Sequence, residues 1–309
     1  MSETMESLRT KIDRANDLQS VVRTMKTLAA SNIGQYEKSV IALSDYYHTV
    51  ELGLGLCFRK IALLPAPIKG KGQKNACLIE AVVFGSDQGL VGQFNDTITD
   101  YVVKELETLP GKAQVWAVGE RVYSRLADLG LQSIGLYNVP NSVKAITPLI
   151  GQILVENEKL RSQDEDVELH LYYNRHKTRV TYEPVSQRLL PFDETWQRNL
   201  IQLPWPTKNL LAEVFGDSTE TLRALIREYL FVSLFRACAE SLASENASRL
   251  AAMQRADKNI DELLDDLRGS FYRVRQTGID EELFEIVSGF EALSHSRNSA
   301  QYGSNIYKN

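Results

Sequence analysis

The sequence is poor in the residues that build metal centres, disulfides and membrane spans. It holds three cysteines and four histidines, and neither type shows the spacing of a metal site or a disulfide framework. No uninterrupted apolar run reaches the roughly 18 residues of a membrane-spanning helix, and the first residues lack the apolar core of a secretory signal. We therefore expect no bound metal and no membrane span, with Cys57, Cys77 and Cys238 as small buried apolar side chains.

The net charge argues against a strongly basic nucleic-acid-binding protein. The formal net charge is -5, whereas nucleic-acid-binding chains usually carry an excess of Lys and Arg. Hydrophobic residues make up 43% of the chain, which is enough for a sizeable core. At 309 residues, the length suggests about two domains.

Apolar residues recur every seven positions through the N-terminal part of the chain. Positions seven residues apart are all apolar from the second turn onward: Leu8, Ala15, Val22, Ala29, Tyr36, Leu43, Val50 and Cys57. A second apolar lane runs beside this one, and it shifts where Gln19 and Lys26 fall, so that Leu18 and Met25 take their places. Alternating spacing of three and four is typical of a coiled-coil helix, and no proline precedes Pro65.

The C-terminal part repeats this pattern. Its seven-residue steps are Leu225, Val232, Ala239, Asn246, Met253, Ile260, Leu267 and Val274. The single polar member is Asn246, and a polar residue in such a seam usually fixes the register of two helices at some cost in stability. Because both ends are long and carry a seam on one face, we expect them to pair with each other.

Between the two seams the pattern changes to alternating strands and helices. The continuous apolar run at 76–84 predicts a buried strand of a parallel sheet. The further predicted strands are 113–119 and 131–138, followed by a hairpin of 167–174 and 178–189, and the predicted helices are 95–106, 120–130 and 142–160. Strand-helix repetition in this order predicts a small doubly wound sheet. The proline-bearing segment 190–208 is interpreted as a linker.

Four segments follow from these patterns. They are an N-terminal coiled-coil helix at 1–62, an α/β globular domain at 63–207, a C-terminal coiled-coil helix at 208–291 and a polar tail at 292–309, for which we expect no regular structure. The fold class is a long antiparallel coiled coil of N- and C-terminal helices with an inserted Rossmann-like α/β domain. The ends of an inserted domain lie close together, as an antiparallel helix pair requires.

Two motifs are candidate chemical sites. The glycine-rich turn at 85–95, GSDQGLVGQFN, lacks the spacing of a dinucleotide fingerprint and the Lys-Ser/Thr ending of a Walker loop. We interpret it as a tight turn whose glycines permit positive φ or close packing, with nucleotide binding as the weaker alternative. The acids of the last helix, Asp261, Glu262, Asp265 and Asp266, are interpreted as a solvated surface. The sequence thus predicts no catalytic residues and no cofactor.

Three stretches resemble the gamma subunits of F-type ATP synthases over about residues 5–291. They are the segment from Met25 to Ser31, the turn motif from Ser86 to Asn95, and most of the last helix. In that helix the matching residues are Glu245, Arg249, Met253, Arg275, Gln276, Ile279, Glu282, Leu283, Glu285, Ile286, Val287, Ser288 and Gly289. The resemblance implies a rotary central shaft that couples ion flow, of H⁺ or Na⁺, to ATP synthesis or hydrolysis.

The resemblance also implies partners and contact residues. The partners are the alpha and beta subunits, the epsilon subunit and the c-ring, at the cytoplasmic face of a prokaryotic plasma membrane. Arg249 and Gln276 match the family's polar contacts to a beta-subunit loop, and Met25 matches a position that faces the beta lever. Asp280 stands at a third contact position, where the family commonly carries Thr.

The chain departs from the family pattern in two places. Gln88 and Val91 stand where many members carry Arg and Cys, and the cysteine-bearing redox insert of the chloroplast members is missing. A divergent bacterial or archaeal branch without thiol regulation is therefore expected. Two other classes stay open: a nucleotide-dependent enzyme with helical arms, which would bind NAD or ATP saturably, and a coiled-coil scaffold unrelated to rotation, which would self-associate into a stable rod.

Overall fold

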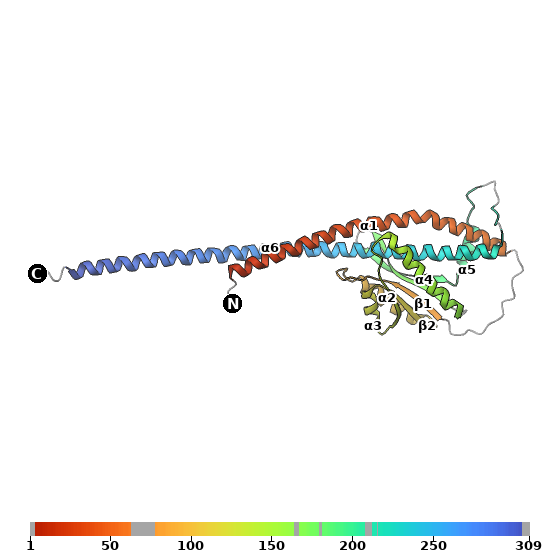
Figure 1. Ribbon diagram of the computed structural model, residues 1–309, viewed down its shortest axis with the longest axis horizontal. Coiled ribbons are helices and arrows are strands. Elements are labelled where there is room, and N and C mark those ends of the chain that lie inside the picture. Colours follow the sequence, from red (N-terminus) through yellow and green to blue (C-terminus); the bar gives the residue numbers. More distant parts are fainter. Residues whose placement is uncertain are drawn as a thin grey trace. The chain divides into compact units, whose positions relative to one another are not determined.

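The structure is a computed structural model that describes residues 4–62, 78–163, 167–178, 181–207, 212–214 and 216–304. Its elements are α1 (Met5–Ala62), β1 (Leu78–Phe84), α2 (Phe94–Thr108), β2 (Lys112–Val118), α3 (Glu120–Asp128), β3 (Ser133–Tyr137), α4 (Val143–Gln163), β4 (Val167–Thr178), β5 (Thr181–Leu190), α5 (Glu194–Gln202) and α6 (Ser218–Ser304) (Figure 1). Cys57 and Cys238 are buried free thiols, as expected, and Cys77 lies outside the described residues.

The five strands form one sheet in the order β3-β2-β1-β4-β5. Strands β3, β2, β1 and β4 are parallel, and β5 pairs with β4 in the antiparallel direction. The predicted parallel strand at 76–84 and the predicted hairpin are therefore confirmed. Strand β1 lies in the centre and is almost entirely buried, which explains why it is apolar on both faces rather than alternating. The exception is Glu80, whose carboxyl accepts a hydrogen bond from the Asn157 side chain.

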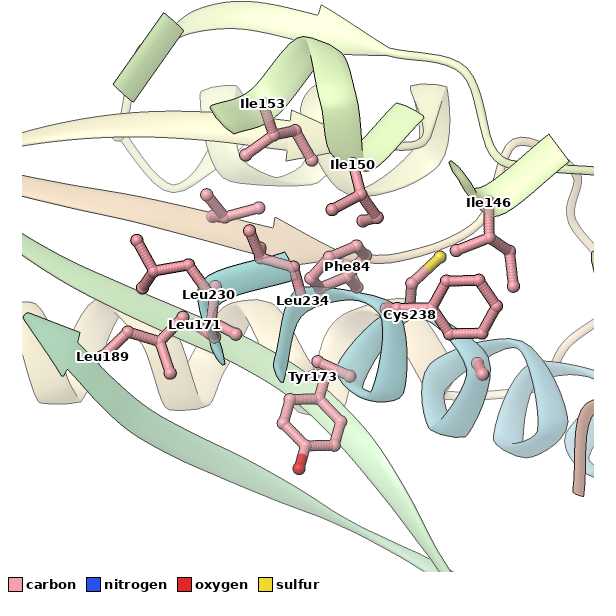
Figure 2. Close-up of a cluster of buried hydrophobic side chains, with 14 of the residues drawn as sticks. Phe84, Ile146, Ile150, Ile153, Leu171, Tyr173, Leu189, Leu230, Leu234 and Cys238 are labelled. Carbon is pink, nitrogen blue, oxygen red and sulfur yellow. The ribbon is translucent and has the colours of Figure 1, made fainter. Parts of the chain in front are cut away.

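Helices cover both faces of the sheet. On one face, Ala81 and Val83 of β1 pack in a cluster that includes Ile98 of α2 and Val122 of α3. On the other face, a second cluster takes its side chains from several elements, among them Phe84, Ile146, Ile150, Ile153, Leu171, Tyr173, Leu189, Leu230, Leu234 and Cys238 (Figure 2). That second face is thus covered by α4 together with the N-terminal part of α6, which attaches the α/β domain to the long helices.

The chain divides into two compact units, Met25–Met253 and Met1–Thr24 with Gln254–Asn309. In the larger unit α1 and α6 run antiparallel, because Asn32 bonds to Asn246 while Tyr47, further along α1, contacts Tyr229, which comes earlier in α6. The seam positions Ala29, Tyr36 and Val50 are buried there, in agreement with the seven-residue pattern.

In the smaller unit the same two helices also pair antiparallel. Gln19 donates a hydrogen bond to Asp261, and Arg23, one turn further, pairs with Asp257. The predicted shift of lane at Gln19 is wrong, because Gln19 is 8% exposed while Leu18 is 54% exposed. A polar side chain can occupy the seam since its amide finds a carboxylate partner on α6, so burial leaves no unsatisfied donor.

Two further expectations need correction. The segment 190–208, interpreted as a linker, contains α5, whose Trp196 stacks on Phe192 with ring centroids 4.9 Å apart; this packing was invisible in the local pattern. Helix α6 begins at Ser218 and continues to Ser304, into the tail expected to lack regular structure. An established helix extends at little cost where no proline stops it.

Candidate partner-binding sites

The glycine-rich turn after β1 is closed by its own side chains. Asn95 Oδ1 accepts a hydrogen bond from the Ser86 backbone N–H at 3.0 Å, and Asn95 Nδ2 donates to Ser86 Oγ at 2.9 Å. Gly92 has φ 58 and Leu90 has φ 63, a left-handed region that favours glycine. The interpretation as a tight turn is confirmed.

Asp87 ties this turn to the two neighbouring strand ends. Its Oδ1 accepts from the Glu120 N–H at 3.1 Å, where α3 begins, and its Oδ2 accepts from the Val139 N–H at 2.9 Å, just after β3. A Rossmann fold would bind a phosphate at this edge of the sheet. Here a carboxylate already occupies the backbone donors, and its negative charge opposes a phosphate.

The same turn rests on α6, beside one of the predicted contact residues. Ser248 Oγ donates to the Val91 carbonyl, and Arg249 Nη2 lies 2.7 Å from Glu245 Oε1. The side chain of Glu245 is 5% exposed and that of Arg249 is 14% exposed. Burial raises the pKa of Glu245, and the neighbouring Arg249 opposes that shift.

The ion pair with Glu245 limits how much of Arg249 is available to a partner. A buried carboxylate holds the guanidinium one turn back along the helix, so only part of Arg249 faces outward. Sequence reasoning named Glu245 as a family-pattern residue but not as the partner of Arg249. The four-residue spacing of opposite charges was the signal that could have identified the pair.

The other predicted contact residues lie on the long helices. Met25 is half-buried on α1, in the larger unit with Arg249. Gln276 and Asp280 are both exposed on α6 in the smaller unit. Their four-residue spacing places them on one side of the helix, so the structure brings these two together.

An exposed apolar surface next to Gln276 and Asp280 was missed by sequence reasoning. Six large side chains of α6 are between 47% and 75% exposed: Ile279, Leu283, Phe284, Ile286, Val287 and Phe290. Since α1 begins at Met5 and pairs antiparallel, this stretch lies beyond the reach of α1. An apolar surface of this extent on a polar chain marks an interaction site, and we name residues 279–290 the apolar end of α6.

Comparison with known proteins decides the family. A family model described as ATP synthase matches residues 4–293. The chain belongs to the ATP synthase gamma family. The gamma chain of Clostridium botulinum strain Hall is 26% identical over 289 residues, which cover 92% of this chain and 96% of that one. The gamma chain of Clostridium pasteurianum is 26% identical over 296 residues, with 94% and 99% covered.

Solved ATP synthases share the fold of this gamma-family chain. The Euglena gracilis mitochondrial OSCP/F1/c-ring structure in rotational state 3 matches with a TM-score of 0.61 at 16% identity, covering 95% of each chain. The Tetrahymena thermophila central stalk/c-ring structure matches with a TM-score of 0.53 at 21% identity, covering 76% of this chain and 99% of that one. Across the described residues, no helix of this gamma-family chain meets the length and apolarity of a membrane span.

Proposed function

We propose that this gamma-family chain is the central rotor of an F-type ATP synthase and couples ion translocation through the membrane sector to ATP synthesis or hydrolysis. The observation that carries the proposal is the family match over residues 4–293. The antiparallel pairing of α1 with α6, seen in each unit, supports it. Paired helices resist bending and twisting better than a single helix, and a rotor must transmit torque.

The partners in this proposal are an alpha/beta hexamer around the helices, and an epsilon subunit and a c-ring beside the α/β domain. The apolar end of α6 favours binding inside the hexamer, because contact with alpha and beta subunits would remove its large side chains from water. A rotor that presents different faces to each beta subunit acts as a ligand with a different affinity for each beta conformation. Rotation would then drive each beta site between its states in turn.

The chain itself would catalyse no reaction. The carboxylates of Asp87 and Glu245 have structural partners of their own. The complex would be a peripheral assembly at the cytoplasmic face of a prokaryotic plasma membrane. In it, Arg249 and Gln276 would bind a beta-subunit loop, Met25 would face the beta lever, and Asp280 would lie next to the same loop without the hydroxyl of the family's usual Thr.

Reconstitution tests the rotor. The chain is co-expressed with the alpha and beta chains encoded with it, and the purified complex is assayed for ATP-driven rotation of a bead fixed to the α/β domain. The rotor role predicts one copy of this chain per hexamer and stepwise rotation. A chain that leaves alpha and beta untouched and instead forms rods, or binds ADP saturably by itself, overturns the proposal.

Charge reversal tests the role of Arg249 within that complex. Arg249→Glu should lower rotation-coupled ATP hydrolysis severalfold, and Arg249→Gln, which keeps the space filled beside Glu245, should lower it less. Arg255→Glu is the matched variant, because Arg255 is an exposed arginine further along the same helix. If all three variants hydrolyse ATP with the coupling of the parent complex, Arg249 has no role in partner contact.

A further inference from the structure

A small polar cavity lies where the β4–β5 hairpin meets the two long helices, inside the larger unit. Its volume is about 150 Å³, and its lining residues are Tyr47, Tyr173, Arg175, Gln187, Ser233 and Arg236. One residue comes from α1, two from β4, one from β5 and two from α6. The cavity is therefore built by tertiary structure from four elements.

Two guanidiniums in this cavity share one carboxylate. Glu240, whose side chain is 11% exposed, accepts from Arg175 Nε at 3.2 Å through one oxygen and from Arg236 Nε at 2.7 Å through the other. Arg175 Nη2 also donates to the Tyr173 hydroxyl at 2.8 Å. Each guanidinium carries five N–H donors, so a single carboxylate leaves most of this donor capacity for another acceptor.

The remaining lining groups add hydroxyls and an amide. The ring of Tyr173 lies at the border of the apolar cluster, and its hydroxyl points away from that cluster (Figure 2). Ser233 is 3% exposed; its Oγ makes no hydrogen bond of good geometry, but the Tyr229 hydroxyl lies close enough to interact with both Ser233 and Gln187. A second acid, Glu51, is half-buried one turn along α1 from Tyr47. It interacts with the Tyr47 hydroxyl and with Arg236, so it offsets part of the positive charge of the cavity.

We propose that this cavity binds a small tetrahedral oxyanion, with inorganic phosphate as the type ligand, between Arg175 and Arg236. Guanidiniums bind such oxyanions through paired, charge-assisted N–H bonds, and Ser233 and Gln187 supply uncharged donors. At about 30 Å³ of liquid volume for each water, the cavity has the room of about five waters. That suffices for a phosphate ion with a water or two and is too small to enclose a nucleotide.

A bound oxyanion would connect the β4–β5 hairpin to α6 and α1. Ligands that bind only the folded state stabilise it by mass action, so phosphate would stiffen the attachment of the α/β domain to the helices. The cavity differs in charge from the glycine-rich turn at 85–95. There the carboxylate of Asp87 occupies the backbone donors, and its negative charge opposes phosphate. Binding at the cavity does not depend on the rotor role, so the two can fail separately.

Calorimetric titration of the purified full chain with inorganic phosphate at fixed ionic strength tests the site. We expect saturable binding of one ion, at least about tenfold weaker in Arg236→Gln because a charge-assisted partner is lost. Arg227→Gln is the matched control: it removes an exposed arginine from the same helix, one that pairs with Glu158 on the surface, and it should leave the affinity unchanged.

Two further arms keep the result decisive. Ser233→Ala removes only the buried hydroxyl and should weaken phosphate severalfold with an unchanged circular dichroism spectrum, even if Arg236→Gln fails to fold. Sulfate should compete with phosphate, and ADP should not, because the cavity is too small. The proposal is wrong if phosphate gives no more heat than chloride, if ADP competes as well as sulfate does, or if Arg227→Gln weakens binding as much as Ser233→Ala.

Discussion

Replacing Asp87 with alanine should destabilise the α/β domain, because its carboxylate connects the turn at 85–95 to two other segments of the domain. The carboxylate accepts backbone hydrogen bonds from Glu120, at the start of α3, and from Val139, just after β3. Hydrogen bonds to a charged group contribute about 1.5–3 kcal/mol each, so two give an upper value of about 6 kcal/mol. Because Asp87 is half-buried and water can replace part of the loss, we expect about 3 kcal/mol. Asp87→Asn, which keeps one acceptor oxygen, should cost about half.

Urea unfolding followed by tryptophan fluorescence measures this loss, because one of the three tryptophans, Trp116, lies in β2 within the same domain. Gln88→Ala is the matched variant: it removes an exposed side chain from the adjacent position and should change the unfolding free energy by less than about 0.5 kcal/mol. If Asp87→Ala falls within that same margin, the carboxylate does not hold the turn to α3 and to the segment after β3, and a partner-binding role for the motif aspartate would become the better explanation.

Three other perturbations follow from buried polar groups and glycines. Burial raises the pKa of Glu80, so the folded state loses stability as pH rises through that pKa. Glu80→Gln should therefore be more stable than the parent by about 1 kcal/mol at alkaline pH and equal to it at acid pH. Thermal melts at both pH values would show this. Asn246→Leu should cost about 1–2 kcal/mol by stranding the Asn32 amide, while adding Asn32→Leu should restore most of it; a double-mutant cycle with no coupling would contradict this. Gly119→Ala should cost more than about 3 kcal/mol, because φ is 118 and the new Cβ would meet backbone atoms of Ser86 at 2.7 Å. Gly130→Ala, with φ 83 and open space around it, should cost only about 1 kcal/mol. Equal melting temperatures for the two variants would refute the difference.

The pairing of the two chain ends could be predicted because it rests on a repeat that each end carries by itself. Val22 and Val232 mark lanes of apolar residues that only a long helix places on one face, and both are buried. The central sheet was equally readable, since an apolar run such as β1 has few alternatives to a buried parallel strand. The family motifs could be read from the sequence too, because they are strings of neighbouring residues.

Other features depended on contacts between residues far apart in the chain, which no local pattern contains. Gln19 lies in the seam only because Asp261 satisfies its amide, and α5 forms where Trp196 finds Phe192 and Tyr229 to pack against. The oxyanion cavity joins Arg175 to Arg236 through Glu240. Periodicity determined which face of each helix is apolar, whereas the polar partners that decide where a charge or an amide can be buried exist only once the chain has folded.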